Sequence, residues 1–154
     1  MALFVPVAVV WVMLDLAVKA WFNQFPAGTV VVGPLAGLVR FRVAHNTGGA
    51  WGMFGDATIV LGVLSLAVCA GLLGYVLLSR RATAGEALGA ALVFAGGLGN
   101  AVDRFTLGYV VDFIDPVFID FPTFNVADIG VTCGFVIFFA ALFLRAHREE
   151  AEAR

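Results

Sequence analysis

Charged side chains are scarce in this chain. They make up 13% of its 154 residues, whereas 62% of the residues are hydrophobic and the mean hydropathy is +1.00. A soluble domain carries about 25% charged residues, so the deficit excludes an ordinary soluble domain and predicts a polytopic membrane protein. The net charge of −2 and the lack of a basic run argue against a nucleic-acid partner.

The chain also lacks the residues that other membrane hydrolases use. Its two serines, Ser65 and Ser79, have no histidine close by in the sequence, which argues against a serine nucleophile with its base. No HExxH motif of a zinc peptidase is present. The two cysteines, Cys69 and Cys133, each lie inside an apolar run. We interpret them as small packing residues rather than a disulfide framework or a thiolate metal site.

Four long apolar runs are present, and each is long enough to cross about 30 Å of hydrocarbon. The expected spans are at about residues 3–22, 57–78, 86–104 and 124–145. Arg80 and Arg81 follow the second span, and Arg145 and Arg148 follow the fourth. Because basic residues of short loops stay in the cytoplasm, this pattern predicts cytoplasmic termini and two longer outer loops.

The first outer loop, residues 23–56, is expected to contain a small sheet. Residues 29–32 and 38–44 are rich in β-branched side chains, and residues 39–43 alternate apolar and basic. The expected fold is therefore a mainly α membrane protein with four transmembrane helices and a small extracytoplasmic β-sheet in the first outer loop. Arg40 and Arg42 either meet lipid headgroups or lie on a solvated strand face.

Residues 96–128 concentrate the ionisable groups, with five aspartates and one arginine. Two carboxyls that share a proton can activate water, one as base and one as acid. Asp112 lies in an apolar run, so burial should raise its pKa. Asn125 is predicted to cap the fourth span with Asp128 at the capping-box position, near the positive end of the helix dipole. Helix capping alone is the alternative role for Asp128.

Other ionisable residues have more than one interpretation. Asp15 and Lys19 are spaced i, i+4 and can pair. Their pair either closes the helix end, with the lysine reaching the interface, or faces protein and braces a site. Asp103 precedes Arg104 directly, which predicts an ion pair at the helix end. The remaining carboxylates of the stretch are interpreted as ordinary loop residues: Asp115 and Asp120.

Five short motifs occur in order along almost the whole chain. They are Asp15 with Lys19, NTGGAWG at 46–52, GLGNAVDR at 97–104, VVDF at 110–113 and FNVAD at 124–128. With these motifs the sequence resembles the bacterial lipoprotein signal peptidases, also called signal peptidase II. The members of this family are membrane aspartyl peptidases. The resemblance implies that Asp112 and Asp128 are the catalytic pair. Positions that match residues kept around the family's site are Asn46, Gly48, Asn100, Arg104, Asn125 and Ala127.

The resemblance also implies a reaction. The substrate would be a diacylglyceryl-modified prolipoprotein, cleaved just before its lipidated cysteine at the outer face of the bacterial cytoplasmic (inner) membrane. No metal or organic cofactor is required, membrane lipids are the other partners, and a monomer is expected. Two alternatives of other classes are a small proton-coupled carrier that uses the same aspartates and a non-catalytic scaffold. A carrier should show repeat symmetry and helices broken near the midplane, whereas the polar residues here cluster at one side.

Overall fold

The computed structural model describes residues 2–49, 57–79 and 81–153, so 50–52 of the first-loop motif and Arg80 lie outside the described residues. Four helices are long and apolar enough to span a bilayer within this part of the chain. They are α1 (Phe4–Phe22), α2 (Thr58–Leu78), α3 (Ala84–Thr106) and α4 (Val126–Glu152). The expected four-helix arrangement is confirmed, and α4 continues for two turns beyond its apolar part.

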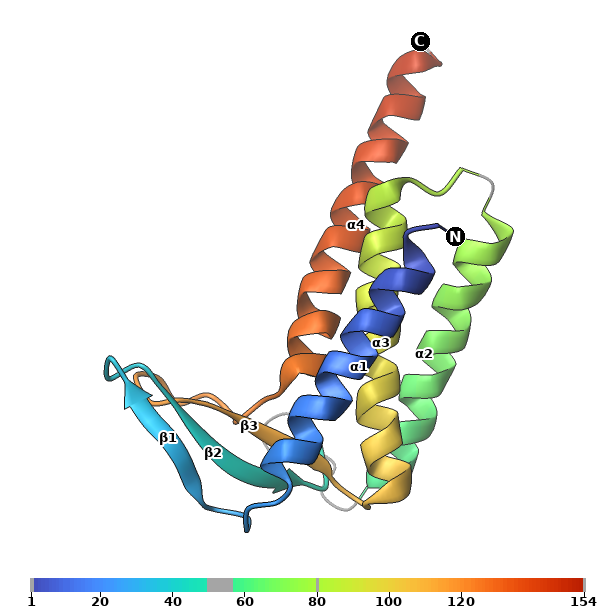
Figure 1. Ribbon diagram of the computed structural model, residues 1–154. Helices are drawn as coiled ribbons and strands as arrows, with labels where there is room; N and C mark the ends of the chain where they lie inside the picture. Colours follow the sequence, from blue (N-terminus) through green and yellow to red (C-terminus); the bar gives the residue numbers. More distant parts are fainter. Residues whose placement is uncertain (1, 50–56, 80, 154) are drawn as a thin grey trace.

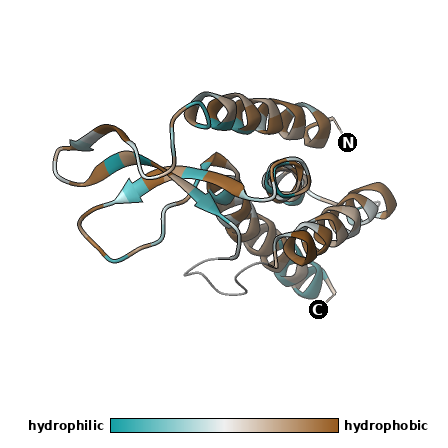
Figure 2. Ribbon diagram, turned by 90° about the horizontal axis from the view of Figure 1, so that it is seen from below, coloured by the Kyte–Doolittle hydropathy of each residue, from teal (hydrophilic) through white to brown (hydrophobic). Residues whose placement is uncertain are grey.

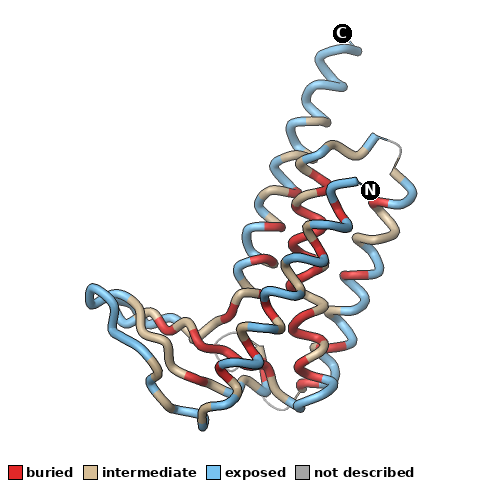
Figure 3. Tube along the Cα trace, in the orientation of Figure 1, coloured by how far each residue is buried: buried red, intermediate tan, exposed pale blue. Residues whose placement is uncertain are grey.

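Helix α3 lies at the centre of the bundle, and the other three pack around it (Figure 1). In the most apolar 18-residue stretch of α3, 61% of the residues are buried, compared with 17–22% in the corresponding stretches of α1, α2 and α4. Figure 3 shows this concentration of buried residues along α3. The outer helices therefore present most of their surface to lipid, while α3 faces protein.

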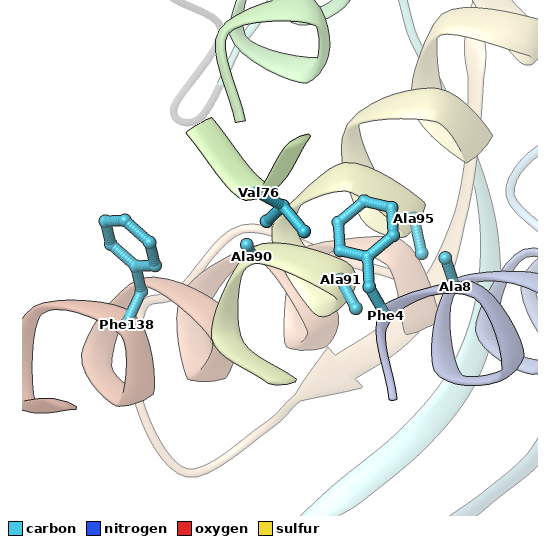
Figure 4. Packing of buried hydrophobic residues seen from close by; sticks show 7 residues of the cluster. All are labelled: Phe4, Ala8, Val76, Ala90, Ala91, Ala95 and Phe138. Atoms are coloured by element: carbon cyan, nitrogen blue, oxygen red, sulfur yellow. The ribbon is translucent and has the colours of Figure 1, made fainter. Parts of the chain in front are cut away.

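Small residues explain why α3 can be central. A Cβ added at Gly89 would lie 2.5 Å from the backbone nitrogen of Phe138, and one added at Gly134 would lie 2.8 Å from the Gly89 carbonyl oxygen. Such glycines let two helix backbones approach closely in lipid. Figure 4 shows alanines of α3 lying between Phe4 of α1 and Phe138 of α4. The buried members of this cluster are Phe4, Ala8, Val76, Ala90, Ala91, Ala95 and Phe138.

The sheet has three antiparallel strands in the order β1-β2-β3. They are β1 (Val30–Leu35), β2 (Val39–Asn46) and β3 (Val110–Pro116). The first two confirm the sheet predicted in the first loop. The third strand comes from the second loop, and its pairing with β2 places Ala44 opposite Asp112.

The sheet extends to one side of the bundle, at the end opposite both termini (Figures 1 and 2). It is fixed to α1 by aromatic stacking, since the rings of Phe22 and Phe113 lie 4.1 Å apart and nearly parallel. Val43 and Val111 complete this second buried cluster. The sheet thereby holds β3, and Asp112 with it, against the ends of the helices.

The interpretation of Asp115 as an ordinary loop residue is wrong. Asp115 lies in β3, is buried, and accepts hydrogen bonds from the Nε atoms of Arg40 (2.6 Å) and Arg42 (2.7 Å). Burial alone would raise the pKa of Asp115, but the hydrogen bonds and charges of Arg42 and Arg40 outweigh it and hold the pKa below its usual value. Both arginines thus bind a carboxylate within the sheet, whereas Asp120 lies in an exposed loop as predicted.

Candidate active site

Asp112 and Asp128 come from different elements and meet at one cavity. Asp112 lies in β3, and Asp128 lies in the first turn of α4. The cavity has a volume of about 530 Å³, and both carboxylates line it together with Asn46 and Arg104. Its other described walls come from Gly49 of the first loop, from the loop before α4 and from the first two turns of that helix.

Asn125 connects the two carboxylates. Its Nδ2 donates to Asp112 Oδ1 (2.7 Å), while its Oδ1 accepts from the backbone N–H of Asp128 (2.9 Å). The backbone N–H of Asn125 donates in return to Asp128 Oδ2 (3.2 Å), which completes the predicted capping box. Since the side-chain oxygen of Asn125 is committed to capping, its amide nitrogen must face Asp112. The start of α4 therefore fixes the position of both carboxyl groups.

The carboxyl of Asp112 is almost fully enclosed. The residue is 2% exposed, and its second oxygen accepts from Asn46 Nδ2 (3.0 Å). Burial, reinforced by the negative charge of Asp128, raises the pKa of Asp112 to about 7, although Asn46 and Asn125 act in the opposite direction. This agrees with the shift expected from its apolar sequence. A carboxyl with such a pKa can both hold and release a proton near neutral pH.

Asn100 holds the carboxylate of Asp128. Its Nδ2 donates to Asp128 Oδ1 (2.8 Å), and its Oδ1 accepts from Lys19 Nζ (2.8 Å) and from Asn125 Nδ2 (3.1 Å). An ammonium group can only donate. Lys19 therefore fixes the oxygen of Asn100 toward itself and the amide nitrogen toward Asp128.

The Asp15–Lys19 pair faces protein, which decides between the two interpretations of the sequence. Lys19 is 2% exposed, and its Nζ lies 2.8 Å from Asp15 Oδ2 and 3.5 Å from Asp103 Oδ2. Asp15 Oδ1 also accepts the backbone N–H of Ala127 (2.8 Å). A Cβ at Gly99 would collide with Asp15 Oδ2. The pair thus braces α3 and α4 at Asn100 and Ala127, next to residues that hold the two carboxylates.

The predicted ion pair between Asp103 and Arg104 is not formed among the described residues. Asp103 Oδ2 accepts the backbone N–H of Val111 (3.0 Å) and faces Lys19. Arg104 Nη2 instead donates to the Gly48 carbonyl oxygen (3.3 Å), and the residue lines the cavity. Neighbouring residues of a helix do not face each other, so one side chain points to the sheet and the other to the cavity.

Two contacts of the site had no clear signal in the sequence. Thr58 at the start of α2 donates to the Thr47 carbonyl oxygen (2.5 Å) and ties the first-loop motif to that helix. Trp11 Nε1 donates to the Val126 carbonyl oxygen (3.2 Å), and its ring fills the space that a side chain at Gly130 would need. Within the described ranges, no cluster of three or more His, Cys, Asp or Glu residues is arranged to hold a metal ion.

Comparisons with known proteins agree with this geometry. The family model described as signal peptidase (SPase) II matches residues 7–144. The chain belongs to the signal peptidase II family. Membership makes it a membrane aspartic peptidase. Among curated relatives, the lipoprotein signal peptidase of Synechocystis sp. is 39% identical over 92% of this chain and 88% of its own. That of Parasynechococcus marenigrum is 38% identical over 86% of this chain and 83% of its own.

The fold of this signal peptidase II family member also matches solved structures. One structure, described as a bacterial membrane enzyme, superposes with a TM-score of 0.86 at 27% identity and covers 95% of this chain and 90% of its own. A second structure of the same description gives a TM-score of 0.81 at 28% identity, over 92% of this chain and 93% of its own. The helical bundle and its sheet are therefore a known membrane-enzyme architecture.

Proposed function

We propose that residues 1–154 form one membrane-embedded peptidase domain that removes signal peptides from diacylglyceryl-modified prolipoproteins. It hydrolyses the peptide bond just before the lipidated cysteine. The observation that carries this proposal is that Asp112 and Asp128 line one cavity while side-chain amides hold both carboxyl groups. The printed name of the relatives, lipoprotein signal peptidase, supports the substrate class. Because the chain belongs to a peptidase family, the carrier alternative is not favoured.

In the proposed mechanism Asp112 is the acid and Asp128 is the base. A water molecule between them attacks the carbonyl carbon of the scissile bond and gives its proton to Asp128. Asp112, whose pKa of about 7 lets it carry a proton at neutral pH, donates that proton to the carbonyl oxygen. Asp128 then passes its proton to the leaving amine of the cysteine, and Asp112 is reprotonated as the carbonyl re-forms. No metal or organic cofactor takes part in these steps.

Replacing either carboxyl with an amide tests the proposal. Asp112→Asn and Asp128→Asn each keep the side-chain shape but cannot take or give the proton. We expect each variant to insert and fold, and to lose at least about 10²–10⁴-fold of the cleavage rate. The assay is cleavage of a lipidated prolipoprotein by purified enzyme in detergent. Asp120→Asn, in an exposed loop, is the matched control and should remain within a few-fold of wild type. Robust cleavage by either site variant would end the aspartyl mechanism.

The proposed setting is the bacterial cytoplasmic (inner) membrane, with the cavity at the extracytoplasmic face and both termini in the cytoplasm. The protein acts as a monomer surrounded by membrane lipids. Support comes from the basic residues beyond α2 and α4, and from the position of the sheet opposite both termini (Figure 1). Reporter fusions after Ser79 and at the C-terminus should report cytoplasm, and one near Gly37 should report the outside. A fusion after Ser79 that reports the outside would refute this orientation.

A further inference from the structure

One wall of the candidate active-site cavity is a segment outside the helices and strands. Residues 121–124 line this cavity, and we call them the wall segment. Its last residue, Phe124, forms a bridge with Ile114 of β3, with backbone hydrogen bonds of 3.0 and 2.8 Å. Segments outside helices and strands open most easily. The shape of the cavity therefore depends on what else holds the wall segment.

Arg42 reaches the wall segment from the far side of β3. Ile114 pairs with Phe41 of β2 as well as with Phe124, so β2 and the wall segment flank opposite edges of β3. Neighbouring strands lie about 4.8 Å apart, and a side chain that joins β2 to the wall segment must therefore cross β3. The side chain of Arg42 does so, and its Nη2 donates to Thr123 Oγ1 (3.2 Å).

Asp115 supports Arg42 where its side chain crosses β3. The Oδ2 atom of Asp115 accepts from Arg42 Nε (2.7 Å) and from Arg40 Nε (2.6 Å). Asp115 is 5% exposed, whereas the side chain of Arg42 is 35% exposed. The buried carboxylate therefore fixes the guanidinium, whose rigid planar fork directs its remaining N–H groups. One of these groups meets the hydroxyl of Thr123.

We propose that Arg42 is a positioning residue, which holds the wall segment in place through Thr123 and so prepares the cavity to bind the peptide of the substrate. This inference rests on the proposed function. The residues on either side of the scissile bond must pass along the cavity walls to bring that bond to Asp112 and Asp128. A wall that is ordered before the substrate arrives adds no ordering cost to binding. Arg42 therefore acts on substrate binding, while the two aspartates carry out the chemistry.

Removing the hydroxyl that accepts from Arg42 tests the proposal. Thr123→Val keeps the shape of the side chain but cannot accept the hydrogen bond. We expect KM for a lipidated prolipoprotein to rise about fivefold, with kcat within about twofold of wild type, because one hydrogen bond outside the reacting groups is lost. Thr123→Ser restores the hydroxyl and should restore the wild-type KM. Thr106→Val removes an exposed threonine hydroxyl outside the cavity and is the matched control.

A double variant shows whether Arg42 and Thr123 act through their contact. Arg42→Met keeps the apolar stem of the side chain and removes the guanidinium. Adding Thr123→Val to Arg42→Met should raise KM no further, because the effects of two residues that act through one contact are not additive. A double variant in which the two single effects multiply would overturn the proposal, and so would a wild-type KM for Thr123→Val.

Hydrogen exchange reports on the wall segment without any substrate. In the full-length protein in detergent, the backbone amides of residues 121–124 should exchange faster in Thr123→Val and in Arg42→Met than in wild type. Unchanged exchange in both variants would overturn the role of Arg42, whether or not the protein cleaves a prolipoprotein. Failure of the wild-type protein to cleave a prolipoprotein would instead refute the proposed function, and the expected effect on KM with it.

Discussion

Two buried polar clusters lie at opposite ends of α3, and they use carboxylates differently. At one end Asp112 and Asp128 are held by side-chain amides. At the other end, Glu86 is fully buried and accepts from the Tyr75 hydroxyl. Its other oxygen forms an ion pair with Arg145 (3.2 Å). Along the helix axis Glu86 lies about 21 Å from Asn100, the α3 residue that holds Asp128.

The two clusters differ in how the negative charge of each buried carboxylate is compensated. The Arg145 guanidinium compensates the charge of Glu86, and the contacts of Glu86 with Tyr75 and Arg145 tie α2, α3 and α4 together. Neutral amides hold Asp112 and Asp128 in place without cancelling either charge. The negative charge of Asp128 adds to burial in raising the pKa of Asp112. A cavity adjoins that end, so water can reach it.

The largest expected effect on stability follows from removing Lys19, which donates to the Asn100 amide that holds Asp128. Lys19→Met leaves Asp15 and Asp103 buried without their cation and frees the amide of Asn100 to rotate. Removing one partner of a buried ion pair typically costs about 3–5 kcal/mol. We expect a much lower folded yield, and at least a tenfold slower cleavage in what remains. Thermal unfolding in detergent and the cleavage assay measure both. Arg148→Met, at an exposed position, is the control, and a wild-type melting temperature for Lys19→Met would contradict the brace.

The second prediction separates the two ends of α3. Glu86→Gln keeps an acceptor for Tyr75 but removes the charge that pairs with Arg145. Because the Arg145 side chain is 22% exposed, water can partly replace the lost partner. We expect a loss of about 1–3 kcal/mol in the free energy of unfolding, with kcat unchanged well below the melting temperature. A tenfold fall in kcat would show that the two ends are coupled and would break the comparison.

The smallest effect is a change in pH dependence. If Asp112 must be protonated to act as the acid, wild-type kcat/KM should fall as pH rises above about 7. Asn46 donates to the ionised carboxyl and lowers its pKa. Asn46→Ala removes that donor, so the pKa of Asp112 rises and the fall in activity should move to higher pH. Thr47→Ala, which keeps the backbone carbonyl bonded to Thr58, should leave the profile in place. A shift to lower pH would contradict Asp112 as the acid.

Local sequence patterns predicted the elements that depend on neighbours in the chain. Apolar runs identified the helices, alternation identified β2, and the spacing of Asn125 and Asp128 identified the capping box. Each of these signals spans only a few turns or residues, so one sequence suffices to detect it.

Contacts between distant segments could not be predicted in this way. The partners of Asp115 are 73 and 75 residues away, and β3 joins a sheet that begins in another loop. The orientation of Lys19 was also open, because hydropathy does not distinguish a helix face that meets lipid from one that meets apolar protein. Only the packed fold shows that Lys19 points inward and that Asp103 and Arg104 diverge.

The i, i+4 ion pair inside α1 has a consequence for how the protein is made. Asp15 and Lys19 neutralise each other within one helix, so the first span can enter the bilayer without exposing a lone charge to hydrocarbon. Their later partners, Asn100 and the backbone of Ala127, follow 81 and 112 residues further along the chain. The nascent protein therefore carries its own temporary charge compensation, and Asp112 and Asp128 are brought together only after the last helix has inserted.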